Sequence, residues 1–122
     1  PGSDNPLGEI KFVFPNPFDI YLHDTPSKSL FGEEKRAFSH GCIRISAPFE
    51  LALYLLRNKK DWGTEKINAV MEGNTERYVQ LGSAVPIYIV YFTAFVDFQG
   101  NLNFRNDIYG RDQPLLKMLL KN

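Results

Sequence analysis

The residues of this chain that could do covalent chemistry lie close together. The single cysteine, Cys42, and the only two histidines, His23 and His40, fall within a span of 20 residues. A thiol nucleophile needs a base that removes or holds its proton, and it needs donors aimed at the oxyanion that forms on the attacked carbonyl. Gly41 lets the backbone approach a ligand closely or adopt a conformation closed to other residues. These residues favour cysteine-based acyl transfer.

The residues around the cysteine could assist that chemistry. The N–H groups of Gly41 and Cys42 are natural oxyanion donors. Arg44 carries a fixed positive charge that suits a carboxylate or a charged intermediate. A helix expected a few residues later would direct its positive end toward this turn, which favours a thiolate.

Simpler interpretations compete with catalysis. A lone cysteine is often just a small buried hydrophobe. Arg44 could pair on the surface with one of three glutamates: Glu33, Glu34 or Glu50. Histidine and cysteine also bind zinc, but His40 and Cys42 are only two apart and no familiar zinc spacing is present. Spacing alone leaves cysteine catalysis and a structural thiol open, and no metal site is predicted.

The first half of the chain must position these residues. Residues 9–14 alternate apolar and polar, which predicts a half-buried strand, and residues 18–22 repeat the pattern. The Pro-Asn-Pro sequence at 15–17 interrupts them, so a hairpin is expected whose second strand ends at His23. Residues 24–40 are polar and predict a long surface connection with a short helical turn.

Helices are expected after the cysteine. Residues 47–58 have apolar side chains at helical spacing, with Pro48 in the first turn and Ser46 as the nearest capping residue. Residues 64–71 predict a second, short helix that Gly73 would end.

The rest of the chain favours strands. Residues 76–81 alternate, and residues 86–92 form a nearly continuous apolar run that is typical of a strand buried on both faces. Residues 93–98 and 101–105 flank Gln99-Gly100 and predict a hairpin, and residues 115–120 predict a terminal helical turn. The expected fold is one domain over residues 1–122, mainly β, with one main α-helix after the cysteine turn.

Composition excludes several classes of function. Fourteen basic residues balance fourteen acidic ones, so no net field attracts nucleic acid or an anionic membrane. The apolar runs are far shorter than the roughly 20 residues that span a bilayer, and the first residues do not resemble a signal peptide. One cysteine permits no intrachain disulfide.

The sequence resembles the YkuD-type L,D-transpeptidases. The motif of that family is a histidine followed, after about fifteen residues, by a Ser/Thr-His-Gly-Cys turn; here residues 24–38 supply fifteen. The resemblance extends to the larger Gram-negative murein transpeptidases and covers nearly the whole chain. It is carried by these strings: Pro1-Gly2, Asn5-Pro6-Leu7-Gly8, Lys11-Phe12-Val13-Phe14-Pro15-Asn16, His23-Asp24-Thr25, Leu30-Phe31-Gly32, Ser39-His40-Gly41-Cys42-Ile43-Arg44 and Asp107-Ile108-Tyr109-Gly110-Arg111-Asp112.

The resemblance implies a role for each site residue. Cys42 would be the nucleophile and His23 its base, oriented through its other ring nitrogen by the backbone carbonyl of Asp24. His40 would line the site and shape the oxyanion pocket together with Gly41.

Two further residues complete the implied substrate-binding set with Asp24. Arg44 would support the donor peptide or the catalytic turn, although many relatives carry asparagine there. The Ser39 hydroxyl would anchor the turn rather than act as a second nucleophile. The implied fold has β-sandwich-like mixed sheets.

The implied reaction is acyl transfer between peptidoglycan stem peptides, without metal or cofactor. Cys42 would attack a donor tetrapeptide between its L-centre residue and the terminal D-Ala, and the amine of a second stem would take the acyl group to give a 3→3 cross-link. Water in place of the amine would make an L,D-carboxypeptidase. The family also implies a periplasmic or cell-envelope location and acylation by carbapenems.

Two alternative functions stay open, and the chain differs from the family in one respect. Another cysteine peptidase of the cell wall would usually place its cysteine before its histidine, whereas here His23 comes first. A non-catalytic cell-wall binding module would keep the turn only as scaffold. Domains of this family open with strands that precede the first segment seen here. The chain is therefore expected to be incomplete at its N-terminus, with an exposed sheet edge beside residues 9–14, low stability, and the missing part of the domain as a partner.

Overall fold

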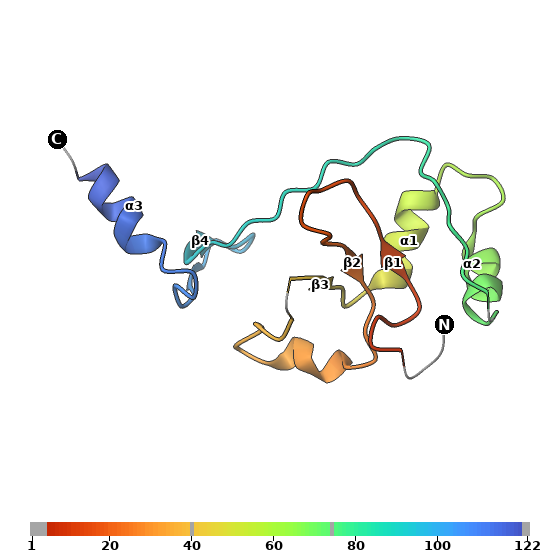
Figure 1. Ribbon diagram of the computed structural model, residues 1–122, viewed down its shortest axis with the longest axis horizontal. Coiled ribbons are helices and arrows are strands. Elements are labelled where there is room, and N and C mark those ends of the chain that lie inside the picture. Colours follow the sequence, from red (N-terminus) through yellow and green to blue (C-terminus); the bar gives the residue numbers. More distant parts are fainter. Residues whose placement is uncertain (1–4, 40, 74, 121–122) are drawn as a thin grey trace. The chain divides into compact units, whose positions relative to one another are not determined.

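The computed structural model describes residues 5–39, 41–73 and 75–120. The chain divides into two compact units, residues 1–84 and 85–122 (Figure 1). The first holds strands β1 (Lys11–Phe12), β2 (Leu22–His23) and β3 (Ile43–Arg44), the 3-10 helix η1 (Lys28–Gly32), and helices α1 (Pro48–Leu56) and α2 (Thr64–Met71). The second holds strands β4 (Ala94–Val96) and β5 (Leu102–Phe104) and helix α3 (Asp112–Leu119). The expectation of one domain stays a prediction.

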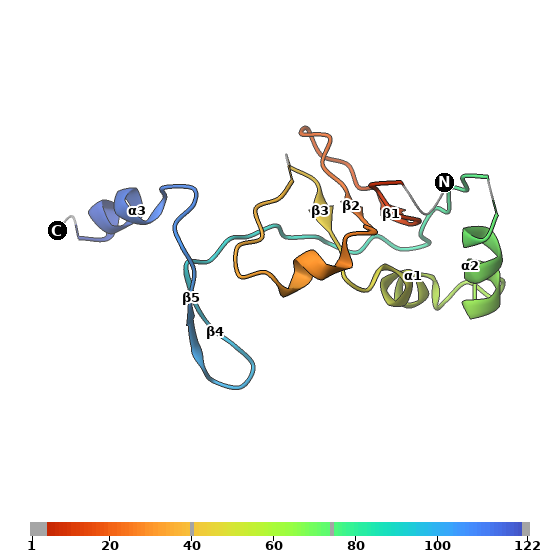
Figure 2. The same cartoon turned by 90° about the horizontal axis from the view of Figure 1, so that it is seen from below.

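A three-stranded mixed sheet forms the centre of the first unit (Figure 2). The predicted hairpin is confirmed, because β1 pairs antiparallel with β2. β3 then pairs parallel with β2, with Leu22 opposite Ile43 and His23 opposite Arg44. The connection from β2 to β3 contains η1, the helical turn expected in this loop.

The side chain of Asn16 closes the hairpin. Its amide nitrogen donates to the carbonyls of Phe14 (3.0 Å) and Ile20 (2.7 Å). Its carbonyl oxygen accepts the N–H groups of Phe18 (3.0 Å) and Ile20 (3.1 Å). Asparagine side chains stabilise turns through such local bonds. A single residue between two prolines thus satisfies the backbone where the strand ladder stops.

Helices α1 and α2 build the core beneath the sheet. Pro48 occupies the first turn of α1 as predicted, but the N-cap is Ala47 and no side chain caps the helix, so the assignment of Ser46 was wrong. Proline at the first position already removes one of the N–H groups that a cap would satisfy. Helix α2 has the predicted bounds. In the described residues the buried core cluster consists of Ala52, Leu56 and Ile67. Phe12 of β1 and Ile10, just before it, pack against this cluster.

Residues 76–81 do not form the predicted strand. Val79 and Leu81 pack against the core cluster, whereas Tyr78 and Gln80 are exposed. The alternation in the sequence is therefore real, but the segment has no ladder in the described part of the chain. A strand requires a neighbour to receive its backbone hydrogen bonds, and alternation does not supply one.

The second unit contains the hairpin expected around Gln99-Gly100. β4 and β5 pair antiparallel, with Phe95 opposite Asn103. Gly100 has φ +85°, a conformation that glycine adopts without strain. The Asp97 carboxylate accepts the N–H groups of Gln99 (3.0 Å) and Asn101 (2.9 Å), so it holds the turn together.

The prediction of a strand at residues 86–92 was wrong. This segment lacks a ladder in the described structure, and its apolar side chains are exposed, from 43% for Ile87 to 84% for Tyr88. A continuous apolar run records a preference for burial on both faces. It does not establish that the covering elements are present.

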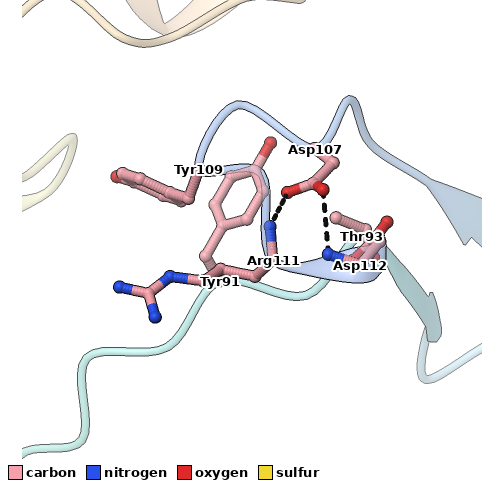
Figure 3. A pocket seen from close by; sticks show the side chains of 6 residues that line it. All are labelled: Tyr91, Thr93, Asp107, Tyr109, Arg111 and Asp112. Carbon is pink, nitrogen blue, oxygen red and sulfur yellow. Dashed lines mark hydrogen bonds between the residues drawn. The ribbon is translucent and has the colours of Figure 1, made fainter. Parts of the chain in front are cut away.

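Helix α3 begins three residues earlier than the predicted turn at 115–120, directly after a turn that the Asp107 side chain holds together. The Asp107 carboxylate accepts the N–H groups of Arg111 and Asp112, both at 2.9 Å (Figure 3). Pro114 is tolerated because it lies in the first turn. Beside the Asp107 carboxylate lies a surface cavity of about 280 Å³. It is lined by Tyr91, Thr93, Asp107, Tyr109, Arg111 and Asp112. Since backbone N–H groups occupy both Asp107 carboxylate oxygens, we interpret these residues as structural and not as a binding site.

The predicted fold class is confirmed. A mixed sheet, a second antiparallel sheet and an α-helix following the cysteine turn match a mainly β catalytic domain. Among the described residues, no helix has both the length and the apolar character that crossing a membrane requires.

Candidate active site

The register of two parallel strands places the predicted nucleophile and base on one face of the sheet. Leu22 lies opposite Ile43 and His23 opposite Arg44. The ladder continues on both sides, since the Ile43 N–H donates to the Tyr21 carbonyl (3.1 Å) and the Ile45 N–H to the His23 carbonyl (2.8 Å). Side chains alternate between the faces of a sheet. The face that carries His23 therefore also carries Tyr21, Cys42, Arg44 and Lys11, the direct partner of His23 on β1. Phe12, Leu22 and Ile43 point to the opposite face.

His23 is held in a defined orientation. His23 is only 4% exposed, and its Nδ1 atom contacts the backbone carbonyl of Asp24. This is the contact expected from the sequence. A carbonyl only accepts, so Nδ1 must carry the proton, and Nε2 is then the nitrogen available as a base.

Tyr21 is a member of this face that sequence reasoning missed. Its ring lies 5.8 Å from the His23 ring, between centroids, at an interplanar angle of 59°. Burial and the neighbouring Cys42 thiol raise the pKa of the Tyr21 hydroxyl. The signal was present in the alternation, because Tyr21 stands two residues before His23 and must share its face.

The turn before Cys42 is built by Gly41 and Ser39. Gly41 has φ +153°, a value that residues with a side chain rarely adopt. The Ser39 hydroxyl donates to the Cys42 carbonyl (2.6 Å) and accepts the Gly41 N–H (3.3 Å). The Ser39 hydroxyl thus links the two sides of the turn. The Gly41 N–H must give up this long bond before it can act as an oxyanion donor.

Cys42 itself is a free thiol of intermediate exposure. It is neither walled into the apolar core nor fully exposed. This exposure fits a thiol that a substrate could reach. His40, which was expected to line the site, lies outside the described residues.

Arg44 is one of two cations that the described structure places on this face; the other, Lys11, pairs with Glu76. The Arg44 Nε and Nη1 atoms are buried, and in the described part of the chain they have no hydrogen-bond partner. The described residues also show no ion pair between Arg44 and Glu33, Glu34 or Glu50. A guanidinium with free donors is suited to bind a carboxylate.

Asp24 contributes through its backbone and its carboxylate in different ways. The carbonyl orients His23. The carboxylate accepts the Glu9 N–H at 3.1 Å and pairs with the Lys28 ammonium. Burial would raise the pKa of Asp24, but the Lys28 ammonium and the backbone N–H groups outweigh it and hold this pKa below its usual value. The carboxylate is therefore satisfied within the chain.

Comparison with known proteins identifies the family of this chain. The model of the YkuD family, described as the L,D-transpeptidase catalytic domain, matches residues 1–87. A protein of Haemophilus influenzae named "Putative L,D-transpeptidase" is 36% identical over 113 residues, which cover 93% of this chain. The chain spans 23% of the length of that relative. The family match covers all the residues of the site, from Tyr21 to Arg44, and more than half of the chain. The chain therefore belongs to the YkuD family of L,D-transpeptidase catalytic domains.

Proposed function

We propose that this chain carries the active site of a peptidoglycan L,D-transpeptidase that forms 3→3 cross-links through a Cys42 thioester. The observation that supports this most is the shared face of the sheet, to which His23 of β2 and Cys42, the residue just before the parallel strand β3, both belong. His23 has its Nδ1 nitrogen engaged by a carbonyl, so Nε2 is left to exchange protons.

The first half-reaction forms the acyl-enzyme. His23 Nε2 takes the thiol proton, and the Cys42 sulfur attacks the carbonyl that joins the L-centre residue of the tetrapeptide to its terminal D-Ala. The oxyanion is stabilised by the Cys42 N–H. The C–N bond then breaks, His23 returns the proton to the leaving amine, and D-Ala departs.

The second half-reaction transfers the acyl group. The side-chain amine of another stem peptide attacks the thioester, His23 takes a proton from that amine, and the C–S bond breaks. The peptide bond of the cross-link forms and the thiol is regenerated. If water attacks instead, the same residues perform L,D-carboxypeptidase chemistry.

Three other residues of the site have roles that follow from their contacts. The Arg44 guanidinium, with buried donors unoccupied in the described structure, would bind a carboxylate of the donor stem. Tyr21 would place its hydroxyl beside the reacting sulfur. Ser39 would keep the Gly41–Cys42 turn in shape through the Cys42 carbonyl. The substrates belong to the cell wall, so we place the enzyme in the cell envelope, facing the periplasm.

Intact-mass spectrometry with a carbapenem tests this proposal. The β-lactam carbonyl should acylate Cys42, so the protein mass should increase by the mass of one carbapenem. Cys42→Ala should remain unmodified and His23→Ala should react much more slowly. A wild-type protein that stays unmodified, or an adduct that persists in Cys42→Ala, would contradict the proposal. With a tetrapeptide stem, release of D-Ala with or without an acceptor amine distinguishes transpeptidase from carboxypeptidase activity.

The non-catalytic alternative predicts a different thiol. In a cell-wall binding module Cys42 would be an ordinary cysteine, labelled by iodoacetamide with a midpoint at or above about pH 8.5. A catalytic Cys42 should be labelled with a lower midpoint that depends on His23. Labelling across pH therefore separates the two functions without any knowledge of the substrate.

A further inference from the structure

A network of contacts outside the reacting groups holds the carbonyl that orients His23. The Asp24 N–H donates to the Ile10 carbonyl at 2.8 Å, which ties this residue to the strand next to β2. The Asp24 carboxylate accepts the Glu9 N–H at 3.1 Å and contacts the Lys28 ammonium. Asp24 is 9% exposed and the following residue, Thr25, is 2% exposed. Asp24, whose carbonyl contacts His23, is thus held through both its backbone N–H and its side chain.

Lys28 extends this network to the cysteine side of the site. Its ammonium also lies 3.4 Å from the Ser46 carbonyl, in the segment between β3 and α1. Asp24 follows the histidine strand, and Ser46 follows the strand that begins just after Cys42. One ammonium on η1 therefore bridges the residue after β2, which ends in His23, and the segment after β3, which begins just after Cys42.

Gly8 provides the space that this arrangement needs. It has φ +62°, and a Cβ atom built on it would lie 2.3 Å from Asp24 Oδ2 and 2.4 Å from Cγ. No Cβ approaches other atoms so closely, so any larger residue must displace the Asp24 carboxylate. The turn at Gly8 is itself closed by the Gly8 N–H, which donates to the Asn5 carbonyl at 2.8 Å.

We infer that Lys28 is a positioning residue of the active site, which holds His23 in register with Cys42 through Asp24 and Ser46. This inference rests on the proposed function. Without the ammonium, Asp24 loses its charged partner and the bridge between the strand ends is lost. The His23 ring should then sample orientations in which Nε2 does not face the sulfur. Positioning errors of about 1 Å can cost roughly a hundredfold in rate.

The test measures the rate of Cys42 alkylation by iodoacetamide between pH 5 and 10 in the full chain. The variants are Lys28→Met, Lys28→Arg and Gly8→Ala, with His23→Ala as the reference and Lys66→Met as the matched control, since Lys66 is an exposed lysine on α2. Charged and titratable groups near the reacting pair on this side of the sheet are Lys11 with its partner Glu76, Tyr21, Asp24 and Arg44. All of them are retained in every variant of the series.

Lys28→Met should slow alkylation near pH 7 about tenfold and move the midpoint of the profile toward that of His23→Ala. Lys28→Arg should restore most of the rate, and Lys66→Met should match the wild type. Gly8→Ala changes no charge but displaces the carboxylate, so it should reproduce the effect of Lys28→Met. Far-ultraviolet circular dichroism verifies that each variant is folded, and ¹⁵N NMR of the imidazole reports whether Nδ1 still carries the proton.

Two results would overturn the inference. The first is a Lys28→Met profile identical to the wild type while His23→Ala is shifted. The second is a Lys28→Met effect that 0.5 M salt removes and that Gly8→Ala does not reproduce, because a purely electrostatic influence is screened by salt. Failure of the proposed function looks different: His23→Ala itself would leave the wild-type profile unchanged.

Discussion

At the scale of single residues, the site follows from the alternation of side chains along two short strands. The types and spacing of His23, Gly41 and Cys42 marked them as candidates, but their roles came from the family resemblance and stay predictions. Tyr21 was not predicted, because a tyrosine two positions before a histidine gains meaning only when the pairing of β2 with β3 is known. Lys28 was missed for a similar reason, since its partners lie four and eighteen residues away.

Replacement of Tyr21 by phenylalanine tests the part that its hydroxyl plays. The ring and its packing against His23 remain, but the hydroxyl beside Cys42 is lost. We expect acylation by a carbapenem to slow about tenfold, which corresponds to about 1.4 kcal/mol, the scale of one hydrogen bond. Stopped acylation reactions followed by mass spectrometry give the rate. An exposed tyrosine on α1, Tyr54→Phe, is the control, and equal rates for Tyr21→Phe and the wild type would rule out this role.

At the scale of elements, the sequence predicted those that are stabilised locally. The first hairpin, helices α1 and α2, and the hairpin of β4 and β5 all contain their own turn or packing signals, such as Asn16, Pro48 and Gly100. The strands expected at 76–81 and 86–92 were wrong, because each needs a partner strand that its own pattern does not identify. The extra residues of α3 were missed because the Asp107 carboxylate, which accepts the N–H groups at its start, lies four and five residues earlier in the chain.

The turns of the second unit should make its stability depend on acidic pH. Backbone N–H groups bonded to Asp97 and Asp107 hold the pKa of each carboxyl below its usual value. A depressed folded-state pKa contributes stability above the unfolded-state pKa of about 4, and this contribution is lost as the pH falls through the folded-state pKa. In thermal melts between pH 2 and 7, the melting temperature of the chain should therefore fall as the pH drops below about 4.

Asp97→Asn isolates one of these contributions. The amide keeps one acceptor but has no charge to titrate, so the variant should melt lower than the wild type at pH 7 and lose less stability on acidification. The exposed Asp61, replaced by asparagine, serves as the matched control. A variant that loses as much stability as the wild type between pH 5 and 2 would show that Asp97 does not contribute to the acid transition.

At the scale of the whole molecule, the balance between core and exposed apolar surface sets the stability. The buried apolar residues among those described are Pro48, Ala52, Leu56 and Ile67, all in the first unit. In residues 85–120 every described residue is at least partly exposed, including large apolar side chains. The hydrophobic effect scales with the apolar area removed from water, so this chain gains little from its second unit.

We therefore expect the 122-residue chain alone to melt at low temperature with weak cooperativity and to bind the dye ANS. Val90, 62% exposed, and Tyr88, 84% exposed, lie in the apolar segment 85–92. Replacing both with serine should reduce ANS fluorescence without lowering the melting temperature, because neither side chain is buried. Leu56→Ala, which removes a core side chain, should instead destabilise the chain by about 2–5 kcal/mol. If the double serine variant destabilised the chain as much as Leu56→Ala, residues 85–92 would be packed in solution, contrary to this prediction. A sharp melt of the wild type at high temperature would contradict it as well.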